Sequence, residues 1–240
     1  MPPMAIDPDP RAAPAPGAPA PAALAPLHVL IPLRSLAGGK ARLGGALDAE
    51  EREELILGML RRTLELVAAW PGAARVHVVS PDEGLLARVG SRAVGTIVQR
   101  GGGLNEGIRA GREVAAGAGA RALLILPGDL PDLSAAALAR LLDAADAALA
   151  AGNGDALVVI APADARQGTN ALLLAPPDVI DPAFGPGSFE AHVAAARAAG
   201  ASLQVVTDPE LGFDLDTPED VELLDPHRMA ALMARGRETT

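Results

Sequence analysis

Short apolar runs alternate with longer amphipathic stretches over most of the chain. The short runs are rich in Leu, Ile and Val and are typical of strands buried in a sheet. They occupy residues 28–33, 76–80, 96–99, 122–126, 156–160, 171–175 and 202–206. Stretches with helical spacing lie between most of them, notably at 105–116, 134–150 and 188–199. This alternation predicts an α/β fold, a three-layer, doubly wound, mostly parallel sheet with helices on both faces.

The stretch after the first strand carries signals for both ends of a helix. Asp48 is predicted to cap it, because Glu51 follows three residues later, where its side chain can return a hydrogen bond. Apolar residues then recur at intervals of three and four, and Pro71-Gly72 is expected to end the helix. A helix of this length can cover one face of the sheet.

Composition separates the two ends of the chain from the rest. Residues 1–26 consist mainly of Ala and Pro and are expected to form a disordered or extended tail. A signal peptide is not expected there, because prolines interrupt the segment throughout. Residues 27–225 are expected to form one domain, followed by a C-terminal helix or tail over 226–240.

The overall composition narrows the classes of partner. The formal net charge of -10 leaves no broad basic face, so nucleic acid is not an expected partner. No apolar run approaches the roughly 20 residues that a membrane span needs, and no cysteine is present for a disulfide or a thiolate metal site. We therefore expect a cytoplasmic protein that acts on a small molecule. Its oligomeric state is left open, with a homodimer as one alternative.

Carboxylates follow two of the predicted elements in an unusual pattern. Asp129 comes directly after the buried run 122–126 in LPGDLPDL, and Asp214 and Asp216 flank Leu215 in GFDLDTPED. Ligands of open α/β sheets bind beyond the carboxyl ends of the strands. In an extended segment Asp214 and Asp216 would share one face, where they repel each other unless a cation or a cationic side chain compensates them. Oxygen ligands from Asp129 and Asp214, completed by water and phosphate, favour Mg²⁺.

These acidic stretches also have simpler interpretations. Asp129 could serve a turn, with Asp132 or Ser134 capping the next helix. Thr217, followed by Pro218 and two acids, is a helix start that needs no function. That interpretation leaves the two acids before Thr217 without a structural reason.

Lys40 is the only lysine among 20 basic side chains, the others being arginine. Its presence indicates a need for a compact, flexible point charge of the kind that contacts phosphates, although chance is the alternative. Gly39 before it lets backbone N–H groups approach an anion closely. A Walker A loop is absent from the sequence.

Three glycine-containing loops precede further predicted elements. Gly103 and Asn105 in RGGGLNEGIRAG, and Gly185 and Ser188 in FGPGSFEAH, stand at helix starts, whose N–H groups can hold a carboxylate or phosphate. Thr169 in QGTNALLL precedes a strand. Ordinary capping by Asn105 or Ser188, and a plain turn at Thr169, are the alternatives.

Six motifs together resemble one family. The motifs are IPLRSLAGGKARL, GGGLNEGIRAG, LPGDLPDL, GTNALLL, FGPGSFEAH and GFDLDTPED. In their order and spacing they are similar to the motifs of the guanylyltransferases of coenzyme F420 biosynthesis. The resemblance covers roughly residues 28–224. It implies the nucleotidyltransferase version of the doubly wound fold, related to enzymes that make nucleotide sugars and molybdenum-cofactor dinucleotides. It also implies transfer of GMP from GTP to a small phosphorylated three-carbon acid, with release of pyrophosphate.

The resemblance assigns roles to residues by motif. Asp129 and Asp214 would hold Mg²⁺, Asp216 would assist, and Lys40 would contact the triphosphate. These four residues make up the expected catalytic group. The phosphorylated acid would be held by Thr169, Gly185 and Ser188, largely through backbone amides, and the nucleotide by Gly39, Lys40, Ser80, Gly103 and Asn105.

The motifs leave the acceptor open. 2-Phospho-L-lactate, phosphoenolpyruvate and 3-phospho-D-glycerate differ by a hydroxyl, a double bond or a phosphate position, and segment 164–167 departs from the family pattern just before the acceptor threonine. The alternatives are a related enzyme using CTP or GTP on a sugar phosphate or molybdopterin, a non-catalytic GTP-binding module, and a purely structural protein. Pyrophosphate release with each nucleotide would distinguish them.

Overall fold

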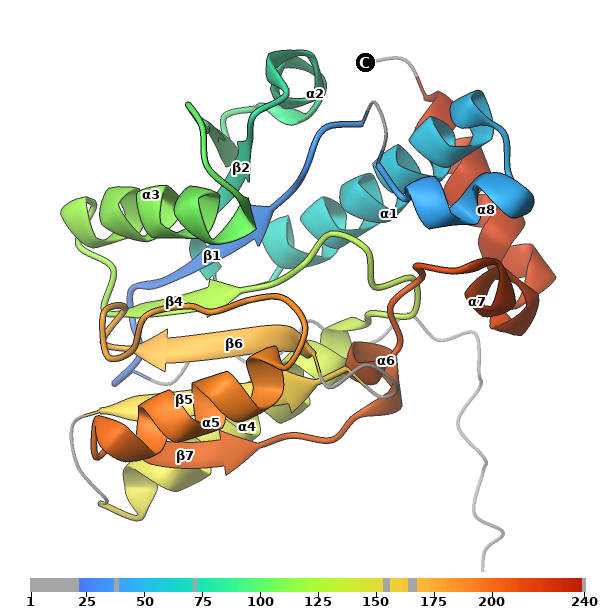
Figure 1. Ribbon diagram of the computed structural model, residues 1–240. Coiled ribbons are helices and arrows are strands. Elements are labelled where there is room, and N and C mark those ends of the chain that lie inside the picture. The colour runs from blue at the N-terminus through green and yellow to red at the C-terminus, as the bar shows by residue number, and fades with distance from the viewer. Residues whose placement is uncertain (1–21, 37–38, 71–72, 153–155, 164–167, 239–240) are drawn as a thin grey trace, which may run out of the picture.

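The computed structural model describes residues 22–36, 39–70, 73–152, 156–163 and 168–238, and these form one seven-stranded sheet with helices on both faces (Figure 1). The strands are β1 (Leu27–Pro32), β2 (Ala73–Ser80), β3 (Val94–Val98), β4 (Ala122–Ile125), β5 (Leu157–Pro162), β6 (Thr169–Ala175) and β7 (Ser202–Val205). Their order across the sheet is β3-β2-β1-β4-β6-β5-β7. Every run of residues predicted as a strand is therefore found in the sheet.

One strand runs against the others. β6 pairs antiparallel with both β4 and β5, whereas all other neighbouring strands are parallel. The mostly parallel sheet is thus confirmed, and the reversal has a local cause: β5 and β6 are joined by residues 163–168 only, while a parallel crossover needs a dozen or more. As a result, the amino end of β6 lies at the same edge of the sheet as the carboxyl ends of its neighbours.

The longer helices follow the sequence signals. They are α1 (Ala49–Ala68), α2 (Glu83–Val89), α3 (Leu104–Gly117), α4 (Ala135–Ala150), α5 (Ser188–Ala198), α6 (Pro209–Gly212), α7 (Pro218–Leu223) and α8 (Pro226–Arg237), together with the 3-10 helix η1 (Ala41–Gly45). Asp48 caps α1 in a reciprocal capping box with Glu51, as predicted. The sequence reasoning missed α2, a helix of 7 residues capped by Asp82. None of the described helices is both long and apolar enough to span a bilayer.

The helices form two layers, one on each face of the sheet. α1, α2 and α4 pack on one face, where Leu60 and Leu141 belong to the same buried cluster as Leu124 of β4. α3 and α5 pack on the opposite face through Ile108 and Val193. Figure 1 shows α3 and α5 in front of the sheet and α1 and α4 behind it. The predicted three-layer arrangement is confirmed.

The packed core extends on both sides of the expected 27–225 domain. Leu24 is fully buried in the same cluster as β1, and α8 lies along α1, where glycines allow very close contact. A Cβ on Gly58 would lie 1.9 Å from the carbonyl oxygen of Leu232, and one on Gly236 would lie 1.9 Å from that of Glu54. The rest of the expected N-terminal tail, residues 1–21, lies outside the described residues.

Candidate active site

The Lys40 side chain meets two of the predicted acids at the carboxyl edge of the sheet. Its Nζ lies 2.5 Å from Oδ2 of Asp129 and also contacts Oδ1 of Asp216. The three residues come from the loop after β1, the loop after β4 and the turn before α7. Parts of the chain separated by 89 and 176 residues thus converge on one ammonium group.

The backbone around Lys40 presents its side chain to this edge. Lys40 adopts the left-handed conformation, with φ 50° and ψ 38°, directly before η1. Gly39 fits tightly beneath it, since an added Cβ would lie 2.8 Å from Cδ1 of Ile56 and 2.9 Å from the carbonyl oxygen of Ser35. Gly39 therefore has a packing reason beyond its predicted contact with the nucleotide. Gly38, next to it, lies outside the described residues.

The two acidic segments are held side by side through their backbones. The N–H of Leu215 donates to the carbonyl oxygen of Asp129 at 3.4 Å. Leu215 itself is fully buried in a cluster with residues of α1 and α8. Asp214 and Asp216 on either side of it remain only partly buried, so the alternation expected for the Asp-Leu-Asp run is observed.

Asp220 fixes the turn that carries Asp216. One oxygen of its buried carboxylate accepts hydrogen bonds from the N–H of Asp216 at 2.8 Å and from the N–H of Thr217 at 2.7 Å. Thr217 caps α7 in return and Pro218 occupies the first turn, as the sequence predicted. The helix start and Asp216 are therefore parts of one hydrogen-bonded arrangement.

Charge at this edge is dominated by the lysine and its two partners. Burial would lower the pKa of Lys40, but the charges of Asp129 and Asp216, and the hydrogen bonds to them, raise it above its ordinary value. Lys40 therefore stays protonated over the whole physiological range. Its one positive charge faces two carboxylates, so the cluster is net negative and favours a further cation.

The donor atoms here are of the kind that Mg²⁺ prefers. The Asp129 and Asp216 side chains keep 29% and 33% of their surface exposed, so a ligand can reach them. Among the residues that the structure describes, no group of three or more His, Cys, Asp or Glu side chains is disposed to hold a metal by itself. Mg²⁺ commonly completes its shell with water and phosphate oxygens, so the assignment to Asp129 and Asp214 stays a prediction.

A second group of predicted residues meets where β6 begins. The hydroxyl of Ser188 donates to Oγ1 of Thr169 at 3.3 Å, and Nδ1 of His192 lies 2.9 Å from the same oxygen. All three side chains are buried. Ser188 is the first residue of α5 and Gly187 is its N-cap, so Ser188 does not cap the helix. His192 was missed by the sequence reasoning.

The side chain of Asn105, near the start of α3, holds the loop that precedes α5. Its Nδ2 donates to the carbonyl oxygen of Phe184 at 2.9 Å, and its Oδ1 accepts from the N–H of Phe184 at 2.7 Å. The cap of α3 is Gly103, not Asn105. Gly185 follows with φ 133°, a conformation that favours glycine. Asn105 thus joins the predicted nucleotide loop to the predicted acceptor loop.

Ser80 belongs to a network that shapes the loop after β1. It is fully buried, and its hydroxyl donates to the carbonyl oxygen of Arg34 at 3.4 Å and accepts from the N–H of Asp82 at 3.1 Å. The Asp82 carboxylate then binds the hydroxyl of Ser35 and the N–H of Leu36, each at 3.0 Å. Backbone donors from Leu85 and Leu36 hold the pKa of Asp82 below its usual range.

Asn170 links the two groups of site residues. Its side chain alternates with that of Thr169 along β6, and its Nδ2 donates to the carbonyl oxygens of Leu211 and Gly212, both at 2.9 Å. Those residues lead directly into Asp214. The start of β6 therefore carries Thr169, which is predicted to contact the acceptor, and supports the acidic segment through Asn170, a role that the sequence did not reveal. Segment 164–167, where the family pattern departs, lies outside the described residues.

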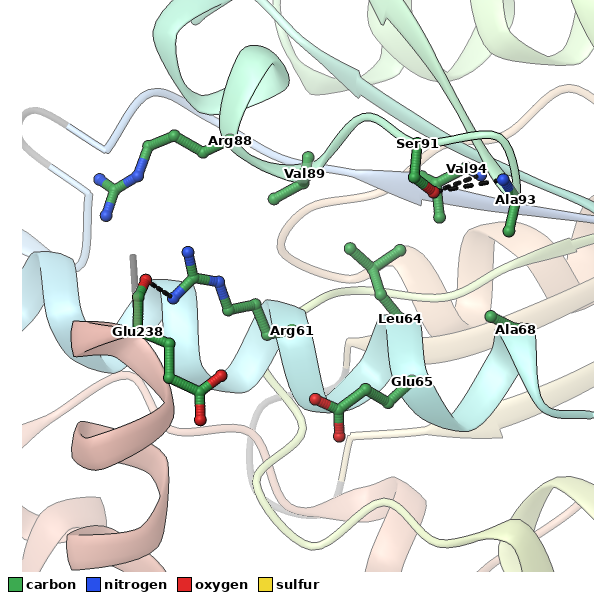
Figure 2. A pocket seen from close by; sticks show the side chains of 10 residues that line it. All are labelled: Arg61, Leu64, Glu65, Ala68, Arg88, Val89, Ser91, Ala93, Val94 and Glu238. Atoms are coloured by element: carbon green, nitrogen blue, oxygen red, sulfur yellow. Dashed lines mark hydrogen bonds between the residues drawn. The ribbon is translucent and has the colours of Figure 1, made fainter. Parts of the chain in front are cut away.

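A hollow of about 420 Å³ lies elsewhere, between α1, the end of α2 and the end of α8 (Figure 2). Two of its polar side chains are already engaged: Nη1 of Arg61 donates to the carbonyl oxygen of Glu238 at 2.6 Å, and Oγ of Ser91 accepts from the N–H groups of Ala93 and Val94. It shares no residue with either group of site residues. The geometry of the strand ends, not this hollow, defines the candidate site.

The fold is that of solved structures in the nucleotide-diphospho-sugar transferase and cytidylyltransferase class. A solved structure from Desulfovibrio desulfuricans, classed provisionally as a nucleotide-diphospho-sugar transferase, matches with a TM-score of 0.69. The match covers 88% of this chain and 96% of that one at 18% identity, so the likeness shows the fold alone. The predicted fold class is confirmed.

Sequence relatives narrow the class to one family. A family model described as CofC-like guanylyl transferase matches residues 27–228. A phosphoenolpyruvate guanylyltransferase of Rubrobacter xylanophilus is 43% identical over 199 residues, which are 83% of this chain and 93% of that protein. One of Sphaerobacter thermophilus is 40% identical over 198 residues, 82% of this chain and 92% of that protein. The chain belongs to the CofC-like guanylyltransferase family, which confirms the resemblance of the six motifs.

Proposed function

We propose that the protein transfers the guanylyl group of GTP to phosphoenolpyruvate, forming a mixed diphosphate and releasing pyrophosphate. The guanylyltransferase activity follows from family membership. The choice of phosphoenolpyruvate is supported by the names of the relatives from Rubrobacter and Sphaerobacter, which are 43% and 40% identical over most of the chain. The product would enter coenzyme F420 biosynthesis.

The observation that carries this proposal is the ammonium of Lys40 between Asp129 and Asp216. A protonated amine at the carboxyl edge of the sheet suits the triphosphate, and the exposed carboxylates suit a divalent cation bound to it. Asp129 and Asp214 would hold Mg²⁺, with Asp216 assisting. When bound, Mg²⁺ would neutralise charge on the phosphates as they react.

The acceptor would lie on the far side of β4, against the start of β6. Thr169, Gly185 and Ser188 are the residues proposed to contact it there, next to the amino end of α5, where the helix dipole favours an anion. Gly39, Ser80, Gly103 and Asn105 line or support the loops assigned to the nucleotide. The two polyanions would thus approach from opposite sides of β4.

The chemistry needs alignment and charge neutralisation more than proton transfer. An oxygen of the acceptor phosphate attacks the α-phosphorus of GTP, a new P–O bond forms, and the bond from the α-phosphorus to the bridging oxygen of pyrophosphate breaks. The attacking phosphate is already ionised near neutral pH, so no general base is required. Lys40 would hold the phosphate chain in line while its charge shifts to the leaving group.

The test is to offer GTP or CTP with each of three acids and to measure pyrophosphate release. We expect turnover with GTP and phosphoenolpyruvate, with lower kcat/KM for 2-phospho-L-lactate and 3-phospho-D-glycerate. Preference for CTP would contradict the nucleotide assignment, and preference for another acid would contradict the acceptor assignment. GTP binding without pyrophosphate release under any acid would favour a binding module instead.

A substitution tests the metal assignment in the same assay. Asp129→Asn should lower kcat by at least about 10²-fold, because it removes one charge from the site where charge is neutralised in the transition state, and it should leave the far-UV spectrum unchanged. Asp143→Asn, at an exposed position of α4, is the matched control and should keep full activity. A folded, fully active Asp129→Asn enzyme would contradict the assignment.

A further inference from the structure

His192 lies at the centre of the group of residues at the start of β6. Its side chain is fully buried, and each ring nitrogen has one polar neighbour: Nδ1 lies 2.9 Å from Oγ1 of Thr169, and Nε2 lies 2.9 Å from the backbone nitrogen of Ala183. The ring of Phe184 packs edge-on against it, with ring centres 5.1 Å apart. One imidazole therefore touches both the strand and the loop that carry the proposed acceptor contacts.

The backbone partner decides which nitrogen of His192 carries the proton. An amide N–H can only donate, so Nε2 must accept from Ala183. In a neutral imidazole the proton then resides on Nδ1, which donates to Oγ1 of Thr169. Burial lowers the pKa of His192 to about 4, so the ring is neutral at physiological pH and this tautomer is the one present.

The same argument sets the direction of the Thr169 hydroxyl. Its oxygen accepts from Nδ1 of His192 and from the hydroxyl of Ser188, which uses both of its lone pairs. Its own hydrogen is then left to donate. A hydroxyl oriented as a donor suits an anionic ligand such as a phosphate or a carboxylate, because it can donate a hydrogen bond to an oxygen of that ligand.

We propose that His192 is a positioning residue of the acceptor site, orienting the Thr169 hydroxyl as a donor through Nδ1 and fixing the loop before Gly185 through Nε2. The inference rests on the proposed function, because it takes the anion beside Thr169 to be the phosphorylated acid. His192 touches no reacting atom; it acts through Thr169 and the backbone of Ala183. A purely structural role would affect stability alone.

Three variants separate the two hydrogen bonds. His192→Phe keeps the ring volume and removes both bonds. His192→Asn places an amide near the position of Nδ1 and can still donate to Thr169, whereas His192→Gln reaches the position of Nε2 and can still accept from Ala183. His28→Phe is the matched control, since His28 is also buried but lies near the start of β1, at the opposite edge of the sheet.

The experiment measures KM for phosphoenolpyruvate, KM for GTP, kcat and Tm for the wild type and the four variants. We expect His192→Phe to raise KM for the acid roughly tenfold, as loss of a hydrogen bond to an anion-binding group does, with KM for GTP within about twofold. His192→Asn should recover most of the acid affinity. His28→Phe should lower Tm with both KM values unchanged.

Several results would overturn the inference. One is a folded His192→Phe enzyme with unchanged KM for the acid; another is a parallel rise of both KM values. If the wild type turns over no phosphorylated acid, the proposed function fails first and the inference with it, and this outcome is visible before any variant is compared.

A measurement on the wild-type protein stands even if the variants do not fold. ¹⁵N NMR of the histidine rings should find one with its proton on Nδ1 at pH 7, identified by its absence in His192→Gln or His192→Asn, or by contacts to the ring of Phe184. Addition of phosphoenolpyruvate should shift its resonances. A proton on Nε2 of His192, or resonances that do not respond to the acid, would contradict the proposal.

Discussion

Lys40 and its two carboxylate partners bring three charged groups together at the carboxyl edge of the sheet. The Lys40 side chain is 11% exposed, and its ammonium is shared between Asp129 and Asp216. Arginine could carry the same charge, but its planar group is wider and its donors point in fixed directions. A compact ammonium can contact both acids and still turn towards a phosphate, which gives the only lysine of the chain a physical reason.

Replacement of Lys40 therefore has a clear expected result. Lys40→Met should lower kcat/KM for GTP by at least about 10²-fold, because the triphosphate loses its fixed cation and the two carboxylates are left to repel it. Lys40→Arg should recover little of this activity. The measurement is steady-state pyrophosphate release with GTP varied. Arg42→Met, an exposed position on η1, is the control, and an equal loss there would argue against a specific role for Lys40.

Sequence reasoning proposed site residues that stand in local motifs and missed residues whose contacts depend on distant partners. Asp129 was noticed because it follows a predicted strand, and Lys40 because it is the only lysine in the sequence. His192 carries no such signal, because its partners are 23 and 9 residues away in the chain and no local motif in α5 marks it. The family motif assigns Asn105 to the nucleotide, and its contact with Phe184, 79 residues away in the chain, could not be read from the sequence.

At the scale of elements, α3 and the loop before α5 are joined by the side chain of one residue. Asn105 reproduces with Phe184 the paired donor and acceptor of a strand ladder. The contact holds the backbone that leads into Gly185, which the family pattern assigns to the acceptor. Loss of the contact should therefore weaken binding of the phosphorylated acid more than binding of the nucleotide.

Asn105→Asp provides the test, because a carboxylate can still accept from the N–H of Phe184 but repels its carbonyl oxygen. KM for phosphoenolpyruvate should rise by about tenfold, and KM for GTP should change less. Glu106→Gln, at the exposed neighbouring position, should behave as the wild type. A rise in KM for GTP alone would instead support the direct nucleotide contact predicted from the sequence.

The contact between α1 and α8 sets a second expectation at this scale. Gly58→Ala would place a methyl group 1.9 Å from the carbonyl oxygen of Leu232, so one helix must move. Overpacking of this kind costs about 1–3 kcal/mol of unfolding free energy, measurable by urea denaturation. Gly117→Ala, where an added Cβ meets nothing within 4 Å, should be neutral or stabilising by up to about 1 kcal/mol. Equal effects would argue against the close approach.

The elements themselves were predicted unevenly, for physical reasons. The long amphipathic helices and the buried strands carry strong periodic signals, and all of them are present. α2 has only 7 residues, too short for two turns of a clear apolar stripe. The reversal of β6 follows from the short connection at 163–168. The spacing of apolar residues carries no information on strand direction, but the length of this connection would have indicated an antiparallel pair.

At the scale of the whole molecule, buried histidines make the folded state sensitive to acid. The pKa of His28 is lowered to about 4 by burial and by the charges of His77 and Arg75, and that of His192 by burial. In the unfolded chain both have a pKa near 6.5, so the unfolded state binds more protons between these values. Stability therefore falls as pH decreases from about 6.5 to about 4 and is unaffected by these groups above that window.

Urea denaturation at pH 7.5, 6 and 5 measures this dependence. Each of these two pKa shifts corresponds to about 3 kcal/mol of unfolding free energy when fully expressed. The urea concentration at the unfolding midpoint should therefore fall clearly between pH 6 and pH 5. His28→Gln should reduce the slope with pH. His227→Gln, at an exposed position of α8, should leave it unchanged. A midpoint that does not vary down to pH 5 would contradict the neutral buried state.

The pairing of β4 with β6 has one last consequence. Three residue pairs join these strands, from Leu123 opposite Leu174 to Ile125 opposite Leu172, and Asp129 and Thr169 stand just beyond that seam. A slip of one residue would displace Thr169 by about 3.4 Å and turn it to the other side of the sheet. The pairing of β4 with β6 thus sets the distance between Asp129, which we assign to the metal, and Thr169, which we assign to the acceptor.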